Sequence, residues 1–259
     1  MNNMTQTQRR LWLIQYLLSE SERYKNIQIP ADGTEQFNLY RSLVNVRTPA
    51  PISEEYLQVE DEYLKEETAH KGITPVTALD FDNDIAIWQG DITTLACDAI
   101  VNAANSKLLG CFCPCHGCID NCIHTFAGVR LRLKCNELMK NQLSDEPTGK
   151  AKITPAYNLP CKYVLHTVGP IVYGELTEKH EALLASSYEA CLKLADENGL
   201  ESIAFCCIST GEFHFPNDRA AEIAVQTVKK YKTETNSGIK VIFNIFKNKD
   251  KEIYEQLLG

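Results

Sequence analysis

The residues with the clearest chemical potential form a short cluster of cysteines and histidines near the middle of the chain. Thiolates and imidazoles are ligands that zinc prefers, and a loop containing Pro114 and Gly117 can fold several of them around one ion. The alternative is a set of small thiols that pack as apolar side chains. The cluster comprises Cys111, Cys113, Cys115, His116, Cys118, Cys122 and His124.

The spacing alone does not choose the ligands among these residues. Since the sequence holds no second cluster at zinc-finger distance, a closed structural site with four ligands would have to be built almost wholly within this loop. An open site with three protein ligands is the other possibility, and sites of that kind are catalytic. The sequence therefore predicts one zinc ion, with either a structural or a catalytic role.

Two other polar segments follow apolar runs that read as strands. Asp91, in the sequence GDIT, can cap the next helical turn, or its carboxylate can accept a hydrogen bond from an exocyclic amine such as that of adenine. Asn102 and Asn105, in the sequence VNAAN, are either turn residues or paired carboxamides suited to a ribose diol. The small alanines between them allow a ligand to approach the backbone.

A third segment, residues 209–216, joins an apolar run to a predicted helix. Gly211 allows close approach, and successive N–H groups at a helix N-terminus can hold a diphosphate. The alternative is an ordinary loop. In an open α/β sheet, ligands lie beyond the carboxyl ends of the strands, so all three segments fall where a binding site is expected.

Hydrophobic patterning divides the chain into two parts. Residues 1–72 show helical spacing, as in Leu11, Ile14 and Leu18, and are expected to form a helical N-terminal extension. Residues 73–259 are expected to form the main domain, an α/β sheet with helices on both faces. Its predicted strands are 85–88, 99–101, 163–167, 203–208 and 241–246.

Two predicted helices have regular apolar faces, and Gly199 suits the left-handed position that ends the first of them. The expected buried residues are Leu184, Tyr188, Cys191, Leu192 and Ala195 in one helix and Ala221, Ala224, Val225 and Val228 in the other.

Composition narrows the range of partners. The formal net charge of -8 over 259 residues argues against a broad surface for nucleic acid or anionic membrane. Arg9 and Arg10 precede an apolar run that Gln15 interrupts, that is too short to span a bilayer and that no cleavage site follows. We therefore expect this run to be an amphipathic helix of a cytoplasmic protein. We also expect a monomer, because no coiled-coil pattern or strongly apolar exposed stretch is evident.

The combined motifs resemble the macrodomain family. The matching segments are GDIT at 90–93, VNAAN at 101–105, PAYNLPCKYVLHTVGP at 155–170 and STGEF at 209–213, and the resemblance covers about residues 84–259. It implies a three-layer fold with a mixed central sheet flanked by helices. Most members have a glycine-rich stretch after VNAAN. The cysteine cluster found there instead resembles the zinc-containing, sirtuin-linked branch of the family.

The resemblance also implies roles for individual residues. In the zinc branch the ligands are Cys111, His116 and Cys118, which leaves Cys113, Cys115 and Cys122 as spectators. Asp120 is expected to orient a water or the substrate ribose, with a helix cap as the alternative, and Asn105, Asp120 and His116 form the expected catalytic group. His124 is expected to be structural, and His214 replaces a glycine common in the family.

The same resemblance implies a substrate site for ADP-ribose. Asp91 and Ile92 are expected at adenine, Asn102 and Asn105 near the distal ribose, and Phe246 stacked near adenine, with a core phenylalanine as the alternative. The remaining expected contacts are Ile119, Asp120, Ser209, Thr210, Gly211, Glu212 and Phe213.

The implied activity is hydrolysis of mono-ADP-ribose from Asp or Glu esters of a modified protein, with a lipoyl-carrier protein modified by a linked sirtuin as one candidate partner. With three protein ligands, zinc can hold a water of lowered pKa or a ribose hydroxyl. The alternatives are an O-acetyl-ADP-ribose deacetylase and a non-catalytic ADP-ribose reader with a structural zinc. A nucleotide phosphatase is weaker, because no acidic metal-binding pair is evident.

Overall fold

Three helices at the N-terminus form a unit beside the main domain. The computed structural model describes residues 4–259. Helices α1 (Gln6–Ser19), α2 (Gly33–Val46) and α3 (Glu54–Lys71) come first, with a short 3-10 helix, η1 (Glu22–Tyr24), after α1. The residue just before each of these α-helices is an N-cap, whose side chain accepts a hydrogen bond from a free backbone N–H of the first turn. These residues are Thr5, Asp32 and Ser53. The predicted helical extension is confirmed.

The buried face of α1 coincides only in part with the residues that showed helical spacing. Its buried residues are Leu13, Ile14 and Leu17, whereas Leu11 and Leu18 are only partly buried. The reason is that α1 packs against both α2 and α3, so its apolar side chains converge on a separate small core. Val129 of the main domain also enters this core.

A six-stranded mixed sheet forms the centre of the main domain, as predicted. Its order is β2-β8-β7-β4-β6-β5, and all neighbours are parallel except β5 and β6. The strands are β2 (Ile85–Gln89), β4 (Ala99–Ala103), β5 (Ala151–Pro155), β6 (Tyr163–Thr167), β7 (Ser202–Phe205) and β8 (Lys240–Ile245). A separate parallel pair joins β1 (Thr74–Pro75) to β3 (Leu95–Ala96), and two 3-10 helices, η2 (Val76–Ala78) and η3 (Ile92–Thr94), lie nearby.

Two of the differences between the observed and the predicted strands have a clear physical cause. Strand β5 was not predicted, because it carries Pro155 and lies at the sheet edge, where proline is tolerated. Strand β7 ends at Phe205, although the predicted run extends to Ile208. Residues 206–208 belong to the loop that follows the strand. Ile208 is nevertheless fully buried, so its apolar side chain extended the predicted strand beyond its real end.

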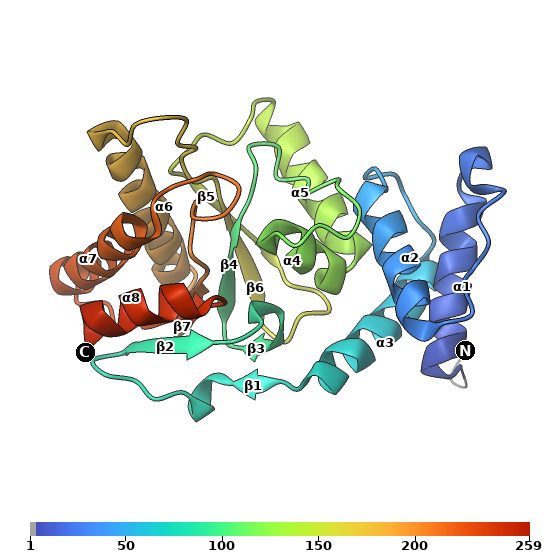
Figure 1. The fold of residues 1–259 in the computed structure, drawn as a ribbon, viewed down its shortest axis with the longest axis horizontal. Helices are drawn as coiled ribbons and strands as arrows, with labels where there is room; N and C mark the ends of the chain where they lie inside the picture. The colour runs from blue at the N-terminus through green and yellow to red at the C-terminus, as the bar shows by residue number, and fades with distance from the viewer. Residues whose placement is uncertain (1–3) are drawn as a thin grey trace.

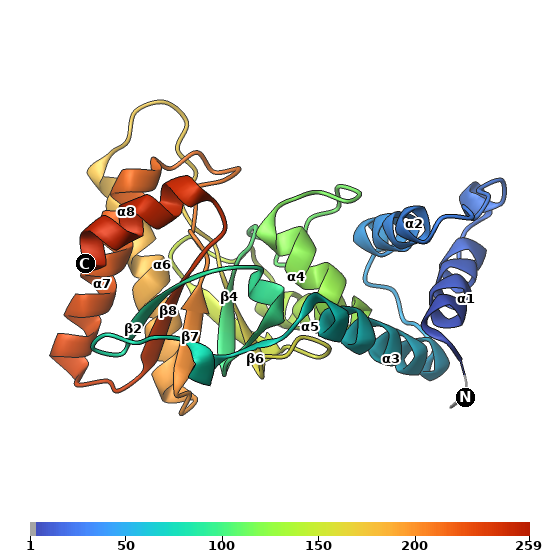
Figure 2. The same cartoon turned by 60° about the horizontal axis from the view of Figure 1, so that its bottom comes forward.

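Helices cover both faces of the sheet. Helices α4 (Ile119–Ala127) and α5 (Val129–Gln142) lie on one side, between the sheet and the extension (Figures 1 and 2). Helices α6 (Glu178–Glu197), α7 (Asn217–Thr235) and α8 (Asn248–Leu258) lie on the other side. This three-layer arrangement confirms the predicted fold class.

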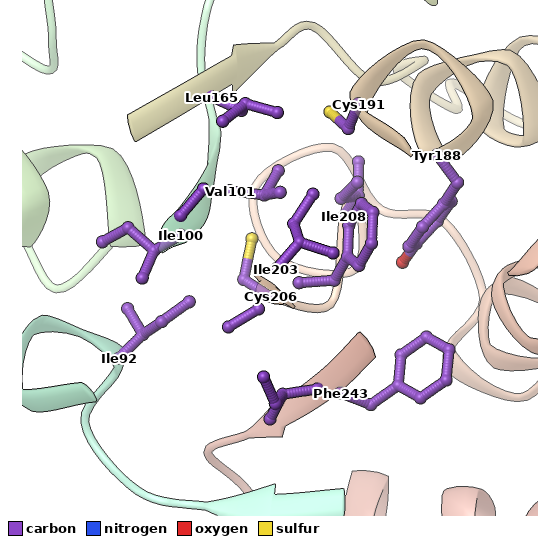
Figure 3. Close-up of a cluster of buried hydrophobic side chains, with 14 of the residues drawn as sticks. Ile92, Ile100, Val101, Leu165, Tyr188, Cys191, Ile203, Cys206, Ile208 and Phe243 are labelled. Atoms are coloured by element: carbon purple, nitrogen blue, oxygen red, sulfur yellow. The ribbon is translucent and has the colours of Figure 1, made fainter. Parts of the chain in front are cut away.

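Apolar side chains from the sheet and from the helix faces fill the space between the layers. Val101, Ile203 and Phe243 of the sheet lie beside Tyr188 and Cys191 of α6 (Figure 3). All nine residues predicted on the two helix faces are buried. Within residues 4–259, no helix is both long enough and apolar enough to cross a bilayer.

Candidate active site

Four of the predicted site segments lie together at the carboxyl ends of the strands. Strands β2, β8, β7 and β4 are consecutive in the sheet and parallel, so their carboxyl ends point the same way. Asp91 follows β2, Phe246 follows β8, the 209–213 loop follows β7, and Asn105 follows β4. The sheet order therefore assembles segments that are separated by up to 155 residues in the sequence, from Asp91 to Phe246.

Asp91 acts as a helix cap and also forms an ion pair. Its Oδ1 accepts hydrogen bonds from Thr93 N at 3.0 Å and Thr93 Oγ1 at 2.6 Å, which caps η3. Its Oδ2 pairs with Lys71 at the end of α3. Burial would raise the pKa of Asp91, but the hydrogen bonds from Lys71 and Thr93 outweigh it and lower that pKa. The carboxylate is therefore ionised and held in place.

Ile92 and Phe246 differ in what they can offer a ligand. The Ile92 side chain is buried in the core (Figure 3), so only its backbone can reach the site. Phe246 is 77% exposed, which excludes the alternative of a core phenylalanine. An exposed aromatic ring at a sheet edge is available for stacking.

The 209–213 loop presents free backbone donors. The N–H groups of Gly211, Glu212 and Phe213 donate no hydrogen bond to any other residue that the structure describes. The loop is closed by Phe215 N, which donates to Ser209 O at 3.0 Å. His214 adopts a left-handed φ of 56°, consistent with the glycine common at this position in the family that the sequence resembles. Successive free N–H groups of this kind suit a diphosphate.

Gly169 supports this loop from the end of β6, a role not predicted from the sequence. A Cβ atom at Gly169 would lie 2.1 Å from Ser209 Oγ, which is closer than any real contact. Val172, three residues on, donates its N–H to Phe213 O at 2.9 Å. The HTVGP motif contained the signal, because a glycine two residues after a buried strand suggests close approach of another chain segment.

The structure brings together the three residues expected to bind zinc. Their ligand atoms all lie within 4.8 Å of one another, and Cys111 Sγ is 3.7 Å from His116 Nδ1. Two tetrahedral zinc ligands of this kind are separated by about 3.6 Å, so the pair fits the ion. Burial and the neighbouring Cys111 raise the pKa of the Cys118 thiol to about 12, and a cation would reverse this effect. Cys113, Cys115 and Cys122 lie outside this group.

Asp120 lies at the start of α4 and is held by two carboxamides. Its Oδ1 accepts from Asn102 Nδ2 at 2.8 Å and its Oδ2 from Asn105 Nδ2 at 3.4 Å. It does not cap α4, whose first residue is preceded by Cys118 without a side-chain cap. Burial raises the pKa of Asp120 to about 6. Asn102 is itself fully buried, so its amide supports Asp120 from behind.

A buried group not expected from sequence spacing lies behind Asp120. Ligand atoms of His124, Cys135 and His166 lie within 4.8 Å of one another. Burial lowers the pKa of His166 to about 4, and His124 is shifted in the same direction, so both imidazoles are neutral. His166 Nδ1 lies 3.2 Å from Asn102 Nδ2 and His166 Nε2 lies 2.9 Å from Thr154 Oγ1, which engages both ring nitrogens. We read the group as support for Asn102.

Comparison with known proteins agrees with this geometry. The family model described as Macro domain matches residues 101–224. A protein-ADP-ribose hydrolase of Treponema medium is 57% identical over 99% of this chain and 100% of its own length. A protein of the same name from Staphylococcus aureus is 48% identical over 94% of each chain.

Solved structures show the same fold. The Trypanosoma brucei macrodomain in complex with ADP-ribose is 30% identical, covers 85% of this chain and 95% of its own, and superposes with a TM-score of 0.65. Because a relative more than half identical spans the whole chain, and the sheet, the loops and the family model agree, this chain belongs to the Macro domain family.

Proposed function

We propose that this chain is a hydrolase that binds ADP-ribose and removes it from mono-ADP-ribosylated proteins, with one zinc ion in its site. The observation that carries the proposal is the approach of the cysteine-histidine loop to the 209–213 loop, where His116 Nε2 lies 3.6 Å from Glu212 Oε1. A diphosphate held by the free N–H groups would lead its distal ribose toward Asp120 and the Cys111, His116 and Cys118 group. The names of the relatives support the same activity.

The positions of the segments at the carboxyl ends of the strands suggest which part of ADP-ribose each of them binds. The ionised Asp91 and the exposed Phe246 ring receive adenine, and the backbone of residues 209–213 receives the diphosphate. Asn105 and Asp120 then face the distal ribose, with Asn102 holding Asp120 in place. Ile119 is partly buried beside Asp120, where it can border the ribose.

Zinc, held by Cys111, His116 and Cys118, would supply Lewis acidity at the ribose end of the site. The protein residues around it have their own tasks. Asp120, with its pKa raised to about 6, can accept or donate a proton near neutral pH. Asn105 fixes the direction of that carboxylate. The reaction we propose is cleavage of an Asp or Glu ester at the ribose.

The proposed partner is a mono-ADP-ribosylated protein, with a lipoyl-carrier protein modified by a sirtuin as the first candidate. We place the reaction in the cytoplasm, because all eleven cysteines lie in the described residues as free thiols.

The decisive experiment measures release of ADP-ribose from a protein mono-ADP-ribosylated on Asp or Glu. The chain is used as purified, with its zinc content determined, beside a chelator-treated sample and a sample to which zinc is restored. Release that is lost with zinc and returns with it supports a zinc-dependent hydrolase. Release that is independent of zinc would still identify a hydrolase, but the metal would then take no part in the reaction.

Binding of ADP-ribose without release would instead identify a reader. Cys118→Ala separates the two roles of the metal in the same assay. We expect this variant to bind ADP-ribose but not to cleave it from the modified protein. Full activity in Cys118→Ala would exclude a catalytic zinc.

A further inference from the structure

The loop that carries the zinc residues has little regular structure of its own. Residues 104–118 contain no helix or strand, and His116 N donates to Cys113 O at a long 3.3 Å. Cys115 adopts a left-handed φ of 52°, which is unfavourable for a non-glycine residue. A loop of this kind needs contacts from elsewhere to hold three ligands in position.

Helix α2 of the N-terminal extension provides one such contact through Arg41. Its guanidinium Nη2 donates to His116 O at 2.6 Å and to Asn121 Oδ1 at 2.8 Å, and its Nε reaches the same Asn121 oxygen at 3.2 Å. One planar fork therefore joins the loop to the first turns of α4. Lysine cannot reproduce this geometry, because its ammonium is a single point donor.

Asn121 connects Arg41 to the rest of the loop through hydrogen bonds. It is fully buried, and its Nδ2 donates to Cys113 O at 2.9 Å and to Cys111 O at 3.4 Å. Because Arg41 occupies its Oδ1, the amide is fixed with its NH₂ group toward these two carbonyls. The backbone at two zinc residues, Cys111 and His116, thus depends on Arg41 directly or through Asn121.

The same face of α2 also holds the tip of the loop. Asn45 is 1% exposed, and its Oδ1 accepts from Cys115 N at 3.0 Å. Cys115 Sγ lies 3.2 Å from Ser42 Oγ and 3.3 Å from Asn38 O. These contacts place the strained Cys115 against a rigid helix. Figures 1 and 2 both show the loop before α4 reaching toward α2.

We infer that the N-terminal extension is a working part of the zinc site, with Arg41 as the residue that positions the metal loop. The inference rests on the proposed zinc site and goes beyond it, since it assigns a function to a segment that lacks any chemical motif. The Arg41 guanidinium hydrogen-bonds to a backbone carbonyl and to side chains other than those of Cys111, His116 and Cys118. It acts by keeping the backbone at Cys111 and His116 in place, which preorganises the three ligands before the ion binds.

The test compares zinc affinity in the full-length chain and in Arg41→Gln, Arg41→Lys and Arg9→Gln. Arg9 is the matched control, because it forms ion pairs with Glu62 and Glu66 within the extension and does not touch the loop. Affinity is measured by competition with a chromophoric chelator, and Co²⁺ substitution reports the geometry of the site through its absorption bands. Binding of ADP-ribose to the metal-free proteins checks that each variant is folded.

Loss of an outer contact to a metal site typically weakens metal binding about 10- to 100-fold. We expect this loss in Arg41→Gln, a smaller loss with altered Co²⁺ bands in Arg41→Lys, and no change in Arg9→Gln. Should Arg41→Gln not fold, Arg41→Lys carries the test, since it keeps the charge and the side-chain stem. Wild-type zinc affinity and Co²⁺ bands in both Arg41 variants would overturn the inference. A wild-type chain without measurable zinc affinity would instead overturn the zinc part of the proposed function.

Discussion

His116 faces the zinc residues with one ring nitrogen and Glu212 with the other. Its Nδ1 lies 3.7 Å from Cys111 Sγ, and its Nε2 lies 3.6 Å from Glu212 Oε1. A carboxylate on the far nitrogen of a metal-binding histidine fixes the ring orientation and makes the near nitrogen a better ligand. At 3.6 Å the contact is longer than a hydrogen bond, and it brings the metal loop beside the diphosphate loop.

Replacing Glu212 by glutamine tests this link. Because Glu212 is 70% exposed and the separation is long, we expect zinc affinity to fall by about 10-fold, the lower end for such contacts. Chelator competition measures the change. Glu189→Gln, an exposed change on α6, serves as the control. Equal affinities in the two variants would leave His116 without support from this carboxylate.

Gly169 is expected to be intolerant of any side chain. The Cβ of Gly169→Ala would meet Ser209 Oγ at 2.1 Å and Ile208 Cγ2 at 2.8 Å, so two side chains at the start of the diphosphate loop have to shift together. We expect affinity for ADP-ribose to fall by at least about 10-fold, because misplacing donors to a charged group costs roughly 1.5–3 kcal/mol. Calorimetric titration measures it. Gly238→Ala, where a Cβ meets nothing within 4 Å, is the matched control and is expected to bind normally.

Glu60 joins the extension to the main domain through a buried carboxyl group. Its Oε1 accepts from Tyr40 Oη at 2.8 Å and from Tyr56 Oη at 3.1 Å, and its Oε2 accepts from Val129 N at 2.9 Å. Burial raises the pKa of Glu60 from its ordinary value of 4.5 to about 7, against the opposing effect of these hydrogen bonds. The folded state therefore binds this proton more tightly than the unfolded state does.

The raised pKa of Glu60 predicts how the stability of the protein depends on pH. The contribution of Glu60 is fully present below about pH 4.5 and is lost as the pH rises through about 7, by up to about 3 kcal/mol of the free energy of unfolding. We expect Glu60→Gln to remove that part of the pH dependence. Urea unfolding at several pH values measures it, with the exposed Glu62→Gln as control. An unchanged pH profile in Glu60→Gln would assign the dependence to other groups.

Phe246 is expected to contribute to ligand binding without contributing to the core. Stacking of a base on an aromatic side chain is worth about 1–3 kcal/mol, so Phe246→Ala should weaken ADP-ribose binding by roughly 5- to 150-fold. Affinity for ribose 5-phosphate, which lacks adenine, should stay unchanged, and so should the melting temperature. Leu143→Ala removes another exposed apolar side chain, one that is 90% exposed, and serves as the control. A parallel loss of both affinities in Phe246→Ala would argue against stacking on adenine.

The alternation of strands and helices could be predicted from the sequence, because buried parallel strands and amphipathic helices follow from local periodicity. The sequence also marked the chemistry of the site, since loops such as 209–213 and the cluster at Cys111, His116 and Cys118 have distinctive residue types at short spacing. Whether Asp91 caps η3, or Phe246 lies in the core, was open at that level. Both depend on neighbours that are distant in the chain.

The distant residues that support the site could be identified only from the packing of the helices and strands. Arg41 is one arginine on an ordinary amphipathic helix, and nothing in its local sequence distinguishes it from Arg9. Its role arises because α2 packs beside α4, which brings its guanidinium to a carbonyl 75 residues further along the chain. Gly169 likewise matters only because β6 ends beside the loop after β7. Such contacts depend on how the elements pack, which hydrophobic periodicity does not encode.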